Sequence, residues 1–140
     1  KELILPVLEY EVKFFKMNPK KGVAVFQIPK SLSRPHYIKE GEKKKAFIRV
    51  KDKTVQASKE VWEILRRGKN PKDMVFTYGE KENILMKFLG EKEKITLNEF
   101  QFLAKLPRFL ASKTLVRLVL ANVIKIVPQE KEDIFILKES

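Results

Sequence analysis

The sequence predicts an α+β protein built from two small modules, and three observations support this class. The N-terminal half contains apolar and polar residues that alternate with period two, which is typical of strands. The C-terminal half places apolar residues at helical spacing and then ends in two short β-branched runs. Between them, residues 69–79 combine proline, asparagine and charge. We therefore expect a linker at 69–79 between modules at 1–68 and 80–140.

The first two strands are expected at residues 8–15 and 23–28. In the first, Tyr10, Val12 and Phe14 share one face, and charged residues occupy the other. A turn at residues 18–22 follows, with proline and glycine. Residues 23–28 are almost continuously apolar, which favours a central strand covered on both faces.

The rest of the first module is expected to contain two more strands and one helix. Residues 30–37 are predicted to be an extended loop, and the charged residues 38–45 a mobile one. Strands are expected at 46–50 and 54–56. Ser58 is a suitable N-cap for a helix that ends near Arg67, with Gly68 after it. Val61, Trp62 and Leu65 form a short apolar stripe that should pack on the sheet.

The second module is expected to begin with a helix at 80–89, which a break at 90–94 ends. Thr96 and Glu99 have the spacing of a capping box, so a second helix should run to about residue 105. A turn at Leu106-Pro107 leads to a third helix at 108–121, and strands are expected at 123–127 and 133–137. With a short strand near Ile95, this is the order of a winged helix-turn-helix domain.

Composition narrows the class of partner. The 140 residues carry a formal net charge of +12, with a pI near 9.8. This surplus favours nucleic acid or an anionic membrane surface, although a soluble protein with a lysine-rich surface is the alternative.

With no cysteine and one histidine, the sequence indicates no metal site and no cofactor. No apolar run approaches the ~20 residues that cross a bilayer, and no signal peptide is recognisable. We expect a cytoplasmic protein, and its first residue, Lys1, suggests a processed or partial chain.

Three motifs of this chain resemble motifs of a known protein family. They are Ile28-Pro29, Arg34-Pro-His-Tyr37, and the run Ala46-Phe-Ile-Arg-Val-Lys-Asp-Lys-Thr-Val-Gln-Ala-Ser58. Together they resemble the C-terminal half of the Schlafen-type AlbA-like domain, a DNA-binding type of domain. Several bacterial proteins of this type carry a C-terminal winged helix and resemble transcriptional regulators. The resemblance implies a partial AlbA-like α/β domain at 1–68 and a winged helix at 80–140.

The chain also departs from this family. The first half of the domain, with its Glu-x-Lys element and its Ala-Asn-x-x-Gly-Gly segment, has no counterpart here. Because the catalytic acids of Schlafen-type nucleases belong to that half, the resemblance transfers no catalytic residue. The remaining sheet would have an open edge, and such edges recruit strands. We expect a homo-oligomer or pairing with a missing N-terminal segment.

The candidate nucleic-acid-binding residues are basic or polar and occur in two groups. In the second module they lie on the outer side of the third helix and in the wing, where Ala111, Leu115, Leu118 and Val119 should face inward and Val116 should lie toward the outside. In the first module they surround the family motifs, where a solvated polar loop is the alternative and Arg49 also suits a structural role. The residues are Lys105, Arg108, Ser112, Lys113, Arg117, Lys131, Arg34, Lys43, Lys44, Lys45, Arg49, Lys51 and Lys53.

Two possible catalytic groups are better explained structurally. His36 has no partner residue in the sequence pattern, so we expect a loop histidine bonded to the backbone. Glu9 and Glu11 share a strand face, but their alternation with Tyr10 and Val12 is typical of a solvent-facing strand. There is also no glycine-rich nucleotide fingerprint.

The sequence therefore predicts a non-catalytic, transcription-regulator-like protein that binds nucleic acid, with DNA favoured. Phe109 and Leu110 would place apolar surface at the start of the third helix, and exposed apolar groups often mark protein contacts. An interaction or oligomerisation module is thus the alternative. A third hypothesis is a piece of a larger nuclease or nucleotide-binding protein whose site lies in the missing half.

Overall fold

The computed structural model describes residues 3–68 and 77–139 and shows a mixed α+β protein. These residues form four helices and eight strands in three small sheets. The chain divides into two compact units, Lys1–Lys45 and Ala46–Ser140. The predicted division at 69–79 differs from this one, because residues after 46 contribute a helix that packs within the second unit. Residues 69–76 of the predicted linker lie outside the described residues.

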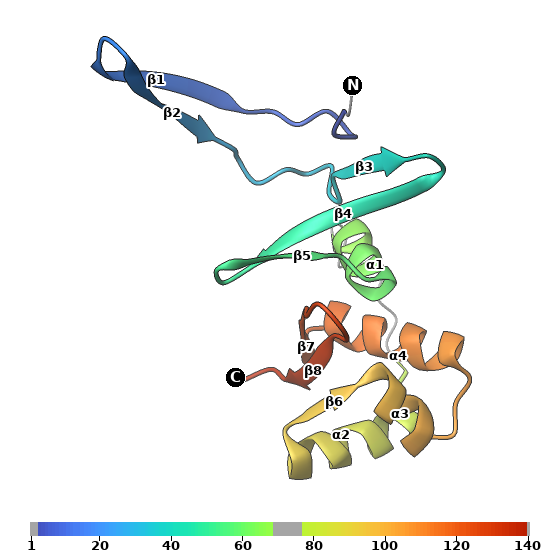
Figure 1. The fold of residues 1–140 in the computed structure, drawn as a ribbon. Helices are drawn as coiled ribbons and strands as arrows, with labels where there is room; N and C mark the ends of the chain where they lie inside the picture. Colours follow the sequence, from blue (N-terminus) through green and yellow to red (C-terminus); the bar gives the residue numbers. More distant parts are fainter. Residues whose placement is uncertain (1–2, 69–76, 140) are drawn as a thin grey trace. The chain divides into compact units, whose positions relative to one another are not determined.

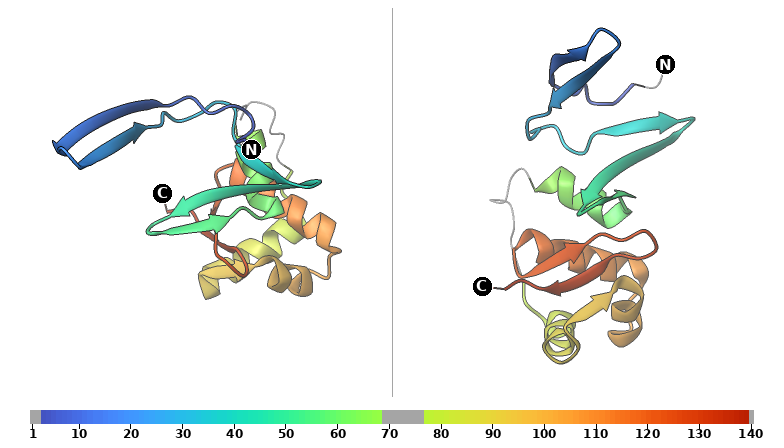
Figure 2. Two further views of the ribbon diagram at one scale, coloured as in Figure 1. Left: turned by 45° about the horizontal axis from the view of Figure 1, so that its top comes forward. Right: turned by 60° about the vertical axis from the view of Figure 1, so that its left-hand side comes forward.

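The first unit contains a two-stranded hairpin of β1, Glu11–Asn18, and β2, Lys21–Gln27. The Asn18 side chain closes the turn, where its Oδ1 accepts hydrogen bonds from the backbone N–H of Lys20 at 2.9 Å and of Lys21 at 2.8 Å. Both views of Figure 2 show β1 and β2 paired with each other. The prediction of a covered central strand at 23–28 is wrong, since β2 is exposed along its whole length and, among the described strands, pairs only with β1.

A second hairpin begins in the first unit with β3, Tyr37–Glu40, and β4, Lys43–Val50. Gly41 lies in the turn with a φ of 61°, a left-handed conformation that glycine adopts without a Cβ clash. The Lys45 ammonium forms an ion pair with the Glu40 carboxylate across the hairpin. Residues 38–45, which the sequence predicted to be a mobile loop, are therefore mostly strand.

The second unit begins with the end of β4, which pairs antiparallel with β5, Lys53–Gln56. Ser58 then caps α1, Lys59–Arg67, and its Oγ accepts a hydrogen bond from the Val61 N–H at 3.1 Å. Both the N-cap and the helix bounds confirm the prediction. The sequence predicted that the apolar stripe of this helix packs on the sheet, but the extensive contact of α1 is with helix α4.

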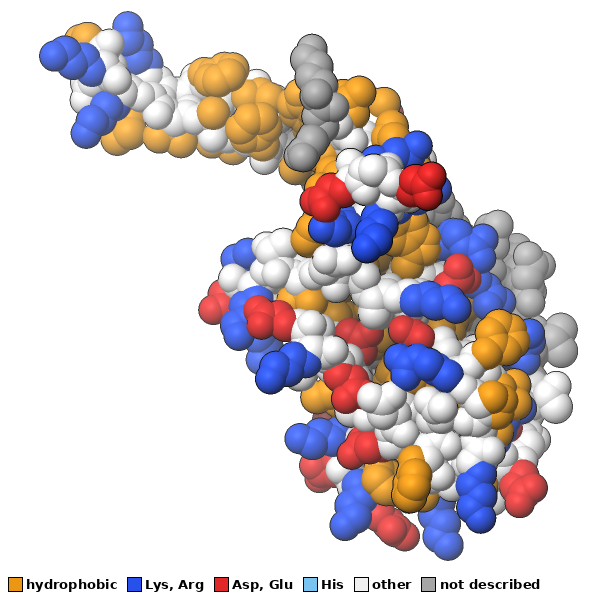
Figure 3. Space-filling view, turned by 45° about the vertical axis from the view of Figure 1, so that its right-hand side comes forward, with side chains coloured by type: hydrophobic (Ala, Val, Ile, Leu, Met, Phe, Trp, Pro, Cys, Tyr) orange, Lys and Arg blue, Asp and Glu red, His pale blue; other side chains and the backbone are white. Residues whose placement is uncertain are grey.

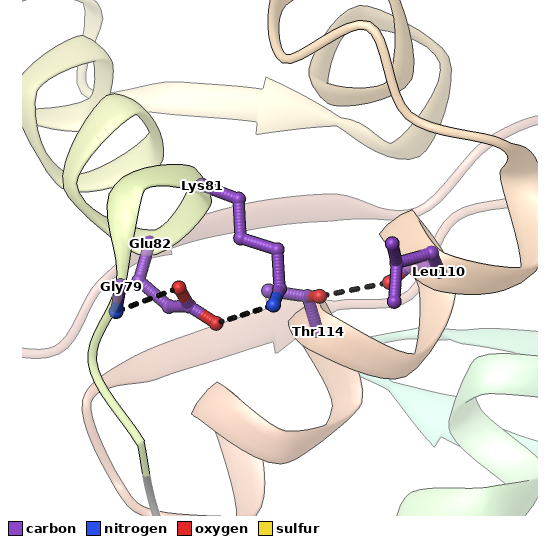
Figure 4. Close-up of polar contacts among 5 residues, drawn as sticks. All are labelled: Gly79, Lys81, Glu82, Leu110 and Thr114. Carbon is purple, nitrogen blue, oxygen red and sulfur yellow. Dashed lines mark hydrogen bonds and ion pairs between the residues drawn. The ribbon is translucent and has the colours of Figure 1, made fainter.

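Helix α2, Glu80–Lys92, is longer than predicted, because Gly90 lies inside it instead of ending it. The helix ends at Glu93, which adopts a left-handed φ of 65° and donates its N–H to the Leu89 carbonyl at 3.0 Å. At the other end, the buried Glu82 carboxylate accepts a hydrogen bond from the Gly79 N–H at 2.9 Å. Figure 4 shows this carboxylate turned back to Gly79. Its second oxygen forms an ion pair with the Lys81 ammonium at 3.4 Å.

The short strand β6, Lys94–Thr96, leads directly into α3, Leu97–Leu103. The capping box is confirmed: Thr96 Oγ1 accepts from the Glu99 N–H at 3.2 Å, and Glu99 Oε2 accepts from the Thr96 N–H at 2.8 Å. Helix α3 ends two residues before its predicted end. Helix α4, Arg108–Leu120, follows after the turn at Pro107, as predicted.

Two antiparallel strands close the second unit: β7, Ile124–Val127, and β8, Ile134–Leu137. Strand β8 also pairs antiparallel with β6, so the sheet has the order β6-β8-β7. Figure 1 shows α2, α3, α4 and these strands gathered into one body. Its buried core draws on every one of these elements and consists of Leu85, Leu89, Ile95, Leu97, Phe100, Ala111, Leu115, Leu118, Ile124 and Phe135.

Candidate nucleic-acid interface

Helix α4 divides into a buried face and a charged face. Three of the four residues predicted to face inward, Ala111, Leu115 and Leu118, are fully buried, and Val119 packs partly against the core. The Thr114 hydroxyl is also buried and donates to the Leu110 carbonyl at 2.8 Å, so its polar group is satisfied within the helix. The exposed residues of α4 are Arg108, Phe109, Lys113 and Arg117.

Helix α1 packs against α4 and covers part of its predicted outer side. The half-buried Ser112 hydroxyl donates a hydrogen bond to Glu60 Oε1 at 2.7 Å, and Glu60 is only 9% exposed. Val116, one turn further along α4, is 3% exposed, so its predicted outward position is wrong. The sequence missed this contact: Glu60 looked like an ordinary acidic residue in the first turn of a helix. Nothing local to α1 indicates that its partner is 52 residues away.

The exposed cations of this segment lie on α4 and in the turn between α3 and α4. Lys105 is exposed in that turn, with a φ of 52°. Arg108 begins α4 and donates from Nη1 to Asn98 Oδ1 at 2.7 Å, which holds its guanidinium near the start of α3. The Lys113 ammonium lies 5.8 Å from the centroid of the Phe109 ring. With Arg117, these four residues are defined as the α3–α4 cationic surface.

No acidic residue occurs in the sequence between Phe100 and Gln129, which includes the whole of α4 and its flanking turns. In the part of the chain that the structure describes, the ion pairs are Lys45–Glu40, Arg66–Glu63 and Lys81–Glu82, so none involves the α3–α4 cationic surface. Its positive charge is therefore not neutralised by a neighbouring carboxylate in an ion pair. Such unpaired cations can bind the phosphates of a polyanion.

Aromatic residues accompany these cations. Phe102 at the end of α3 is 88% exposed, and Phe109 in the first turn of α4 is 70% exposed. Leu103 adds a third partly exposed apolar side chain at 38%. Aromatic rings beside cations suit both base stacking and protein contacts, so this feature alone does not choose between partners.

Lys131 lies in the loop between β7 and β8, where it lines a cleft of about 380 Å³. Asp133 organises this loop: its carboxylate accepts hydrogen bonds from the Ser58 hydroxyl and, at 3.2 Å, from the Gln129 N–H. Because Glu60, Glu130 and Glu132 also line the cleft, Lys131 has acidic neighbours. Arg108 lines the same cleft, so these two cations are less suited to phosphate binding than Lys105, Lys113 and Arg117.

Three predicted basic residues lie on the hairpin of β4 and β5. Arg49 has a structural role, because its Nε donates to the Lys51 carbonyl at 3.2 Å and its Nη1 donates to Thr54 Oγ1 at 3.1 Å. Lys51 and Lys53 are exposed at the turn, and Lys51 has a left-handed φ of 56°. The turn therefore presents two exposed ammonium groups, while the hydrogen bonds of the Arg49 guanidinium stabilise it.

The remaining predicted residues belong to the first unit. Lys43 and Lys44 are exposed on β4, and the Lys44 ammonium lies 5.0 Å from the Tyr37 ring centroid. Lys45 is paired with Glu40, and Arg34 is half-buried with a buried Nε. The basic cluster predicted around residues 34–53 is thus divided between two units.

The two possible catalytic groups are His36 and the pair Glu9 and Glu11. His36 Nδ1 lies 2.8 Å from the Pro6 carbonyl oxygen, a backbone contact of the predicted kind. Glu9 is exposed before β1, and Glu11 is exposed at its first position. Among residues 3–68 and 77–139, no three His, Asp or Glu side chains gather in a group able to hold a metal ion. No helix in these ranges combines the length and apolar character that a bilayer span requires.

Comparisons with protein-family models, with curated proteins and with solved structures found no match. The resemblance to the AlbA-like domain therefore depends on the sequence motifs alone.

Proposed function

We propose that the chain binds nucleic acid, with duplex DNA favoured, through the α3–α4 cationic surface. The observation that carries the proposal is the set of four exposed cations on α4 and in the turn before it, in a segment without acidic residues. A duplex presents one negative charge per ~1.7 Å of its axis, so an unneutralised cationic surface of this kind gains affinity by releasing counterions.

The order of elements in the second unit supports the same proposal. The sequence α2, β6, α3, α4, β7, β8 with sheet order β6-β8-β7 is the order of a winged helix domain. In helix-turn-helix proteins the second helix of the motif lies in the major groove. Here α4 corresponds to that helix, and the loop between β7 and β8 corresponds to the wing.

The packing of α1 favours contacts with phosphates over contacts with base edges. The Ser112 hydroxyl is bonded to Glu60, and Val116 is buried, so the central part of the outer face of α4 is covered. The exposed residues that remain include no asparagine or glutamine on α4 for paired contacts to adenine. We expect binding that depends strongly on salt and weakly on base sequence, without a chemical step.

A salt titration of DNA affinity tests the proposal. The substitutions Lys105→Ala, Lys113→Ala and Arg117→Ala together should weaken binding of a labelled duplex and flatten the plot of log affinity against log salt. Each lost phosphate contact lowers the slope by about 0.9, so three lower it by about 2.7. Arg108 is kept because it also bonds to Asn98.

A matched control comes from α2 and β6. Lys87, Lys92 and Lys94 are also exposed lysines, but Glu91 and Glu93 lie among them. Replacing all three by alanine lowers the net charge by the same amount as the first triple variant. The slope of log affinity against log salt should then stay close to that of the unsubstituted chain. Equal effects of the two triple variants would show that only the total charge matters, and no binding at low salt would refute the proposal.

A protein-interaction function is the second candidate, and the exposure of Phe102 and Phe109 favours it. Phe109→Ser separates the two functions when duplex binding and self-association are measured on the same sample. Loss of a protein contact with unchanged DNA affinity would support the interaction function.

A further inference from the structure

Helix α3 ends on a surface that combines an aromatic ring, a hollow and a cation. Phe102 is 88% exposed and, together with Leu103 and Lys105, lines a hollow of about 650 Å³. Among the described residues, the lining of this hollow contains no Asp or Glu. The nearest acidic residue in the sequence, Glu99, accepts a hydrogen bond from the Thr96 N–H and so points back to the start of the helix. The Phe102 ring therefore has a positive charge and a second apolar side chain beside it.

The first turn of α4 repeats this combination of a ring and a cation. Phe109 is 70% exposed, and the Lys113 ammonium lies 5.8 Å from the centroid of its ring. The two residues are four positions apart on one helix, so they share a face. Figure 3 shows exposed hydrophobic side chains of the second unit with Lys and Arg side chains beside them, in the lower half of the view. Both exposed rings thus have a cation on their own side of the surface.

A fully paired duplex gives the Phe102 ring no suitable partner. In a helix-turn-helix the first helix crosses the DNA backbone, and only the second helix lies in the major groove. Phe102 belongs to α3, the first of these helices, so on a duplex its ring would meet sugars and phosphates. The faces of paired bases are stacked on one another and are out of reach. An unpaired base, by contrast, offers its face to an aromatic ring while cations bind the phosphates of its strand.

We propose that the α3–α4 cationic surface binds a duplex that ends in a single-stranded extension, and that the rings of Phe102 and Phe109 stack on the unpaired bases. This inference rests on the proposed function, because Lys105, Lys113 and Arg117 bind the phosphates of the same nucleic acid. Each nucleotide carries its phosphate close to its base, which matches the cation found beside each ring. Stacking on a ring depends little on base identity, so the surface recognises unpaired bases without reading their sequence.

Binding titrations of the whole chain with three labelled DNA probes test the inference. All probes contain the same duplex: the first is blunt, the second carries an extension of about six thymidines, and the third carries abasic nucleotides in place of those thymidines. The abasic extension keeps the phosphates and lacks the bases, so the comparison isolates stacking from charge. The chain should bind the thymidine extension at least about fivefold more tightly than the abasic one, which is the contribution expected of one stacked base.

Variants of the two rings test which side chains are responsible. The double variant Phe102→Leu and Phe109→Leu keeps apolar side chains but removes the rings, so it should bind the thymidine and abasic extensions within about twofold of each other. Its affinity for the blunt duplex should not change. Phe102→Tyr with Phe109→Tyr keeps the ring faces and should retain the preference. The matched control is Phe14→Leu with Phe15→Leu, which removes two rings of the first unit that are 81% and 57% exposed and should also retain it.

The outcomes distinguish this inference from the proposed function. Equal affinities for the thymidine and abasic extensions, with the blunt duplex still bound, would overturn the inference alone. A preference that survives the double leucine variant would overturn the assignment to these two rings. Loss of self-association in that variant, without any preference among the probes, would assign the rings to a protein contact and overturn stacking. If no probe binds at low salt, the proposed function fails first.

Discussion

The hydroxyl of Ser112 in α4 donates a hydrogen bond to the carboxylate of Glu60 in α1, with 2.7 Å between the two oxygens. Glu60 is 9% exposed, so its negative charge loses much of its hydration, and this donor compensates part of that loss. The bond joins a helix of the predicted first module to the central helix of the predicted second one. It is the clearest reason why residues 59–67 belong to the second unit.

Ser112→Ala should therefore destabilise the second unit by about 1–3 kcal/mol, since the Glu60 carboxylate loses a donor in a mostly buried position. Urea unfolding followed by the circular dichroism of the helices measures this, because all described helices belong to the second unit. Ser33→Ala replaces an exposed serine of the first unit and should change this transition by less than about 0.5 kcal/mol. Equal midpoints for the two variants would mean that the bond contributes nothing.

Phe100 and Phe102 lie two residues apart in α3 and have opposite surroundings. Phe100 is fully buried in the core, whereas Phe102 is 88% exposed. Phe100→Ala should cost about 3–5 kcal/mol of unfolding free energy because it leaves a cavity. Phe102→Ala removes the same atoms from the surface and should change stability by no more than about 0.5 kcal/mol. Comparable losses from the two changes, measured by urea unfolding, would contradict the orientation of α3.

The capping box at the start of α3 has its own prediction. Thr96→Ala removes the acceptor of the Glu99 N–H and should lower stability by about 1 kcal/mol. Thr77→Ala makes the same chemical change at an exposed position outside the helices, and we expect almost no effect. Thermal unfolding of both variants, monitored by the helical signal, is the measurement. A midpoint for Thr96→Ala as high as that of Thr77→Ala would rule out a stabilising cap.

Substitution by glycine should change the stability of the second unit in opposite directions at Glu93 and at Glu91. Glu93 has a φ of 65° at the C-cap of α2, a conformation that costs a residue with a Cβ roughly 1–2 kcal/mol. Glu93→Gly relieves that strain and should stabilise the second unit by up to about 1 kcal/mol. Glu91→Gly removes the same charge within the helix and should destabilise it by about 0.5–1 kcal/mol. The unfolding free energies of the two variants are measured by chemical denaturation. Equal destabilisation of both would contradict a C-cap of α2 at Glu93.

Local hydrogen bonding explains the predictions that were confirmed. The cap residue Ser58 and the box of Thr96 and Glu99 each satisfy backbone groups within three residues, so their patterns can be recognised without knowing the fold. Helix α4 begins at the predicted residue because Pro107 ends the preceding turn. By contrast, Gly90 was expected to break α2, and the helix continues through it because Leu85 and Leu89 anchor this part of the helix in the core.

The candidate site was only partly predictable. Lys113 and Arg117 are exposed as expected, since helical spacing places them away from Ala111, Leu115 and Leu118. Arg108 has the spacing of the buried side and is exposed at the first position of the helix. Val116 was misplaced because its burial requires a neighbour on the outer side of α4, and helical spacing within α4 carries no information about α1.

The sequence by itself determined the caps at Ser58 and Thr96, the approximate bounds of most elements, the α+β class and the acid-free cationic segment around α4. These features depend on the chemistry of neighbouring residues and on periodicity, which are properties of the linear chain. The tertiary structure decided that α1 packs on α4, that Ser112 is bonded to Glu60, and that the apolar β2 lies exposed in a two-stranded hairpin. These depend on which distant segments meet, because an apolar run indicates only that a residue gains from burial, not which surface buries it.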